Sequence, residues 1–162
     1  MRRRIPGFAA AILAAAVAAG GGSLSSPDWG RLKSLVGSWE GTSDGRPVTA
    51  TYELVSNGTA LMEHLNGGHD AEMITMYTPD GATVLATHYC SAGNQPRLRA
   101  KASADGKSID FRFVDASNVK DTSEVMQRLV VTFVDAGHFE QQWTSRGKDG
   151  KDHTSRFRFT RR

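Results

Sequence analysis

Side chains capable of nucleophilic and acid–base chemistry gather around the single cysteine of this chain, Cys90. A cysteine attacks as its thiolate, and an imidazole oriented by a carboxylate lowers the pKa of a neighbouring thiol. The turn signal at residues 79–81 predicts a hairpin in which Glu72 faces His88, with Cys90 on the same face. If the protein is an enzyme, its catalytic residues are therefore expected to be His88, Cys90 and Glu72.

The same residues fit a non-catalytic interpretation, which we prefer. His88 can cap a strand end by hydrogen bonding, and Cys90 can be a small buried apolar side chain. Asn94 and Gln95 follow in the link 91–96, which is long enough to form a mouth or lid loop. Apolar pockets usually carry a few polar groups that orient a ligand, and these residues suit that role.

Small residues on faces expected to point inward would leave space for a ligand, and aromatic and methionine side chains would line it. A filled barrel with no pocket is compatible with the same residues. The expected ligand-binding residues are His88, Cys90, Asn94, Gln95, Met62, Met76, Ala100, Phe111 and Trp143.

Metal-ligand spacing is absent from the sequence. The five histidines include no pair separated by two or four residues, and there is no second cysteine. Structural zinc sites need such closely spaced ligands. We therefore predict no metal site and no cofactor.

The elements that must position these side chains read as strands. From residue 38 onward, short runs alternate between apolar and polar residues and are separated by turn signals, which is typical of an all-β fold. Ten strands joined mostly by tight turns form an up-and-down meander, and closure into an antiparallel β-barrel removes its exposed edges. The predicted strands are 38–44, 48–56, 59–66, 71–78, 82–90, 97–104, 107–114, 124–135, 138–146 and 153–160.

The turns also predict strand register. Asn57-Gly58 is a strong two-residue hairpin signal, and a three-residue loop at 135–137 avoids placing Glu140 opposite Phe133. The predicted facing pairs are Leu54 with Leu61, Leu98 with Phe113, Ala100 with Phe111, Leu129 with Trp143, Val131 with Gln141 and Phe133 with Phe139.

The N-terminal residues have the build of a secretory signal peptide. Three arginines precede an Ala-rich apolar run that ends in a small-residue cleavage site, so residues 1–18 are expected to be removed. Residues 19–31 form a flexible lead and 32–162 the barrel domain. Within 27–35 about two helical turns are expected, with Leu32, Leu35 and Val36 on one face.

Removal of that peptide changes the charge of the chain. The full sequence has 20 Lys and Arg against 17 Asp and Glu, and three of the arginines lie within residues 1–18. The mature chain is then formally neutral, so no nucleic-acid partner is expected. No stable membrane insertion is expected after cleavage of the signal peptide, because its apolar run is too short to span a bilayer. We predict a periplasmic or secreted protein that is a monomer or weak dimer, without an internal disulfide.

A short helix followed by Gly37, Trp39 and a meander resembles the lipocalin-like (calycin) superfamily. That resemblance implies a tryptophan at the closed end of the barrel under an arginine from the last strands, here Arg156 or Arg158. The count of ten strands is similar to that of the fatty-acid-binding and nitrobindin branches of this superfamily. Residues 87–97 resemble a signature found in exported bacterial proteins of this general type. Nitrobindin-like proteins hold haem through a late histidine, and His138 and His153 lie late in this chain.

The sequence therefore predicts an exported lipocalin-like barrel that binds a small hydrophobic or amphipathic molecule. Two alternatives remain, a thiol- and histidine-dependent enzyme using His88 and Cys90, and a haem-binding protein.

Overall fold

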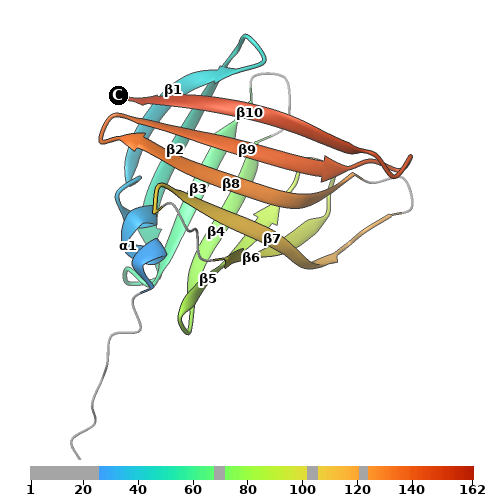
Figure 1. Cartoon of the computed structure of the whole chain (residues 1–162), viewed down its shortest axis with the longest axis horizontal. Coiled ribbons are helices and arrows are strands. Elements are labelled where there is room, and N and C mark those ends of the chain that lie inside the picture. Colours follow the sequence, from blue (N-terminus) through green and yellow to red (C-terminus); the bar gives the residue numbers. More distant parts are fainter. Residues whose placement is uncertain (1–25, 68–71, 102–105, 121–123) are drawn as a thin grey trace, which may run out of the picture.

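A closed barrel of ten antiparallel strands forms the protein, with one short helix before the first strand (Figure 1). The computed structural model describes residues 26–67, 72–101, 106–120 and 124–162, so the predicted signal peptide lies outside the described residues. No helix in this part of the chain is long and apolar enough to cross a membrane. The elements are α1 (Pro27–Lys33), β1 (Gly37–Ser43), β2 (Arg46–Val55), β3 (Ala60–Asn66), β4 (Met73–Asp80), β5 (Thr83–Tyr89), β6 (Gln95–Lys101), β7 (Ser108–Ser117), β8 (Val125–Asp135), β9 (His138–Arg146) and β10 (Asp152–Arg161).

Each strand pairs with its neighbours in sequence, and β1 pairs with β10 to close the barrel. This confirms the predicted all-β, up-and-down architecture. The six predicted facing pairs are also confirmed. The predicted three-residue loop at 135–137 was wrong, because Asp135 pairs with His138 and the extra residue is a bulge at Val134, between Phe133 and Asp135. The loop around Asn57-Gly58 spans residues 56–59, which keeps the predicted register. Phe113 nevertheless does not face the core and is 38% exposed. The pairing of β7 with β8 runs from Ser108 to Arg112, and Phe113 lies just beyond it.

The helix α1 packs across one end of the barrel, which we call the helix end (Figure 1). Ser26 caps it by accepting a hydrogen bond from the Asp28 amide at 3.2 Å. Leu32 and Leu35 are buried, as predicted, whereas Val36 is 40% exposed. The prediction for Val36 was wrong because the helix ends at Lys33, so helical spacing no longer decides where residue 36 points.

Trp39 is buried at the helix end, where its indole N–H donates to the Leu35 carbonyl at 2.7 Å. The guanidinium above its ring belongs to Arg161, whose Cζ lies 4.1 Å from the ring centroid. The expectation of Arg156 or Arg158 in that place was wrong. Phe157 and Phe159 point inward, so the alternation of the strand directs both of these arginines outward.

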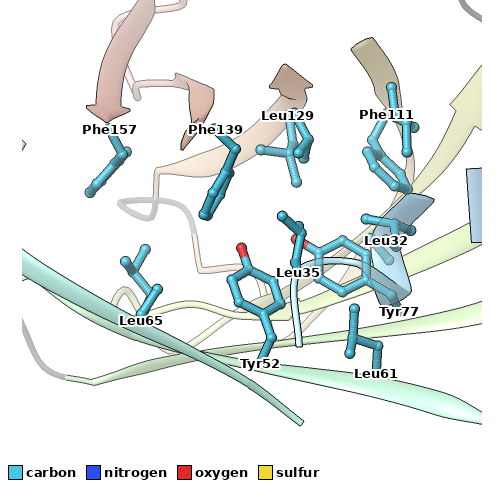
Figure 2. Close-up of a cluster of buried hydrophobic side chains, with 14 of the residues drawn as sticks. Leu32, Leu35, Tyr52, Leu61, Leu65, Tyr77, Phe111, Leu129, Phe139 and Phe157 are labelled. Atoms are coloured by element: carbon cyan, nitrogen blue, oxygen red, sulfur yellow. The ribbon is translucent and has the colours of Figure 1, made fainter. Parts of the chain in front are cut away.

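Apolar side chains from opposite walls meet in the interior of the barrel. Figure 2 shows Phe139, Leu129 and Phe111 pointing toward Tyr52 and Leu61 on the facing wall. A cavity lies toward the opposite end of the barrel, which we call the mouth end.

Close approach between β1 and β10 makes Gly41 intolerant of any side chain. A Cβ at residue 41 would lie 1.9 Å from the Arg158 carbonyl oxygen, which is fixed backbone. We expect Gly41→Ala to lower the free energy of unfolding by about 1–3 kcal/mol or more. Gly30→Ala on α1 is the matched control, because nothing lies within 4 Å of its Cβ and a helical alanine should add about 0.5–1 kcal/mol. Urea unfolding of both variants measures this; equal stabilities would contradict it.

Candidate functional site

A cavity of about 230 Å³ opens at the mouth end of the barrel. At ~30 Å³ per molecule, this volume corresponds to roughly eight liquid waters. Its lining is mixed, with apolar, hydroxyl, thiol, imidazole and carboxylate groups. The lining residues are Leu65, Met73, His88, Cys90, Ser91, Ala92, Glu124, Met126, Trp143, Ser145, Ser155 and Phe157.

His88 is the most deeply buried polar residue of this lining, with 1% of its surface exposed. Its Nδ1 lies 2.9 Å from the Thr75 hydroxyl, and its ring centroid is 4.4 Å from that of Trp143. Nε2 has no hydrogen-bond partner among the described residues. Burial lowers the pKa of His88 to about 4, so the imidazole is neutral near pH 7.

The predicted pairing of Glu72 with His88 was wrong. Thr75 stands opposite His88, a shift of three residues along β4. The hairpin closes from Asp80 to Thr83 and leaves only Gly81 and Ala82 as its turn. Glu72 is instead exposed and forms an ion pair with His64. Glu72 therefore cannot orient the His88 imidazole as the catalytic hypothesis required.

An odd shift in register also exchanges the two faces of a strand. Met73, Thr75 and Tyr77 point inward on β4, which leaves Met76 on the outer surface. Met62 is likewise on the outer face of β3 and pairs directly with Met76. Both methionines were predicted to line the pocket, and neither does.

A buried polar network, which the sequence analysis missed, occupies the middle of the barrel. Glu63 is fully buried, and its Oε1 accepts from the Tyr52 hydroxyl at 2.9 Å and from Gln141 Nε2 at 2.6 Å. Its Oε2 accepts from the Tyr77 hydroxyl at 2.7 Å. Thr75 is a fourth hydrogen-bond partner of this carboxylate. Glu63 is thus held by groups from β2, β4 and β9.

The polar network reaches the cavity by two routes. Thr75 connects Glu63 to His88, and Gln141 accepts from the Trp143 indole N–H at 3.1 Å. Burial raises the pKa of Glu63, and its four hydrogen bonds oppose that rise in part. The burial of Glu63 could have been predicted from sequence, because Glu63 alternates with Leu61 and Leu65 on the same face of its strand.

Cys90 lines the cavity and is partly exposed. Asn94 is fully buried but does not line the cavity; its Nδ2 donates to the Glu124 carbonyl at 2.7 Å. Gln95 lies outside the cavity and accepts from Asn118 Nδ2 at 2.5 Å. Asn94 therefore holds the residues after β5 against the start of β8, next to the cavity wall.

Ala100 and Phe111 are buried in the filled part of the barrel, away from the cavity lining. Trp143 does line the cavity. The late histidines, His138 and His153, are exposed and paired with aspartates, outside that lining. Within the described ranges, no cluster of three or more His, Cys, Asp or Glu side chains could hold a metal ion.

The fold and the cavity together define a closed ten-stranded antiparallel barrel with a small, mixed-polarity pocket at one end. Two solved structures are similar to it. Rv2717c from M. tuberculosis has a TM-score of 0.60 and 14% identity, covering 84% of this chain and 98% of that one. A protein with unknown function from the DUF3598 family of Nostoc punctiforme has a TM-score of 0.57 and 14% identity, covering 81% of this chain.

This chain spans about half (49%) of the length of the Nostoc protein. No family model matches the sequence, and no curated protein matches it. At 14% sequence identity, these two similarities support the fold and say nothing about function. The lipocalin-like assignment therefore stays a prediction.

Proposed function

We propose that this barrel binds a small amphipathic molecule in the mouth-end cavity, with His88 as its polar contact. The observation that carries the proposal is the buried imidazole of His88: this residue lines the cavity, and its buried Nε2 has no hydrogen-bond partner in the part of the chain that the structure describes. Leaving a buried polar atom unpaired costs about 1–3 kcal/mol. A ligand that bonds to Nε2 would remove that cost on binding.

The remainder of the lining supports an amphipathic ligand rather than a purely apolar one. Leu65, Met126 and Phe157 offer apolar contact, while Ser145 and Ser155 add hydroxyls. At about 230 Å³ the cavity is smaller than the ~300–1,000 Å³ pockets of drug-sized ligands. A short-chain or single-ring molecule fits this volume. The lipocalin-like relationship and an exported, extracytoplasmic location belong to the same proposal.

The enzymatic alternative rests on Cys90 and His88 lining one cavity. It is the weaker candidate, because an imidazole with a pKa of about 4 is a poor base near pH 7. Fast alkylation of Cys90 at neutral pH, slowed strongly in His88→Gln, would support it. Alkylation at the rate of a free thiol in both proteins would exclude it.

Fragment screening by ¹H–¹⁵N NMR tests the binding proposal, with native mass spectrometry of protein from its own host as a second readout. We expect shifts confined to cavity residues such as Met126 and Ser145, and an affinity reduced about tenfold in His88→Leu. His64→Leu is the matched control, because His64 lies on the outer face of β3 and should leave binding unchanged. Shifts elsewhere, or no bound fragment and no copurified species, would contradict the proposal.

A further inference from the structure

We propose that the ligand of this cavity presents an uncharged hydrogen-bond donor, such as a hydroxyl, to His88, and that the cavity discriminates against anions. This inference rests on the proposed function and names the chemical class of ligand. It follows from where the single proton of the neutral His88 ring must reside.

The direction of the hydrogen bonds at Thr75 determines that position. Thr75 has one hydroxyl hydrogen and contacts His88 Nδ1, the Glu63 carboxylate and the Tyr77 hydroxyl. The carboxylate can only accept, and the Tyr77 hydrogen is already donated to Glu63 Oε2 at 2.7 Å. The Thr75 hydrogen is therefore directed toward Glu63 and Tyr77, and its oxygen accepts from His88 Nδ1–H.

The opposite tautomer would be costlier. Thr75 would then donate to His88 Nδ1, which removes one donor from the buried Glu63 carboxylate. It would also leave a buried N–H at Nε2 without an acceptor among the described residues, and orphaned N–H groups are rarer than under-satisfied acceptors. Because the hydrogen bond to Thr75 places the proton of the neutral ring on Nδ1, Nε2 is unprotonated and carries a lone pair. Only a donor can pair with it.

Charge in the cavity favours the same class of ligand. Among the described lining residues the formally charged side chain is Glu124, and no lysine or arginine is present. Arg46 lines an adjoining hollow together with Asp44, outside this cavity. A carboxylate ligand would meet the Nε2 lone pair and the Glu124 charge without a cation to offset its desolvation. Short fatty-acid anions are therefore disfavoured.

The test titrates the full chain with three ligands of matched size and monitors binding by NMR. The ligands are hexan-1-ol, its isomer 1-methoxypentane, which lacks the hydrogen-bond donor, and hexanoate. Hexan-1-ol should bind about tenfold more tightly than either of the others, the value of one hydrogen bond. Equal or tighter binding of the ether or of hexanoate would overturn the inference while leaving the binding function intact. Failure of all three to bind, together with an empty fragment screen, would overturn the proposed function itself.

A ligand-free measurement tests the tautomer directly. Long-range ¹H–¹⁵N spectra should show His88 protonated at Nδ1, and protonation at Nε2 would overturn the inference whatever binds. Thr75→Val removes the hydroxyl that fixes the ring, so the preference for hexan-1-ol over its ether should fall severalfold. Thr75→Ser keeps the hydroxyl and should keep the preference; the same loss in both variants would also count against the inference.

Discussion

Replacing Glu63 with alanine is expected to lower the free energy of unfolding by about 3–5 kcal/mol. The substitution removes the acceptor for the hydroxyls of Tyr52 and Tyr77 and for Gln141 Nε2, all of them buried. Each orphaned donor costs about 1–3 kcal/mol, and a cavity replaces the lost methylenes. Urea unfolding at pH 7, followed by tryptophan fluorescence, measures the loss.

Two further variants make this expectation specific to the polar network. Glu63→Gln keeps the shape and one acceptor oxygen, so its loss should be smaller, at about 1–2 kcal/mol. Glu53→Ala removes an exposed carboxylate from the neighbouring strand β2 and should change stability by at most about 0.5 kcal/mol. A Glu63→Ala protein within 1 kcal/mol of the parent would show that the network does not stabilise the fold.

The barrel could be predicted from sequence because its determinants are local. Turn signals such as Asn57-Gly58 locate the hairpins, and the alternation of apolar residues then selects the register in which the apolar faces of neighbouring strands meet. The β4–β5 hairpin shows the limit of this logic. Its Pro79-Asp80-Gly81 signal is compatible with more than one loop length. The predicted register was shifted by three residues, an odd number, so Met76 was assigned to the inner face of β4 in place of Thr75.

The site was harder to predict because its contacts are distant in sequence. Glu63 and Gln141 are 78 residues apart, so nothing local to either strand shows that the two side chains meet. Hydrogen bonds across the barrel, to each other and to the tyrosines, compensate for the burial of both side chains. Arg161 was missed for a similar reason, since it crosses the end of the barrel to reach Trp39 and the carbonyls of Ser34 and Val36.

Acidification is expected to destabilise the protein through His88. Its pKa is lowered from 6.5 to about 4 by burial, so the unfolded chain binds this proton before the folded one does. Stability from this group is fully present above pH 6.5, is lost as pH falls, and levels off below about pH 4. The loss amounts to about 3 kcal/mol, since each unit of pKa shift is worth ~1.4 kcal/mol. Urea unfolding at intervals from pH 7 to pH 4 measures it.

Other titrating groups near His88 require a difference measurement. Glu63 lies behind Thr75, and Glu124 and Cys90 line the same cavity. The raised pKa of Glu63 acts with the opposite sign, because above pH 4.5 the folded state keeps that proton longer and stability falls with rising pH. The comparison of parent with His88→Gln, repeated in a Glu63→Gln background, therefore isolates the histidine. The difference in unfolding free energy should shrink steadily from pH 6.5 to pH 4 in both backgrounds. A difference that does not change with pH would mean that folding does not lower the pKa of His88.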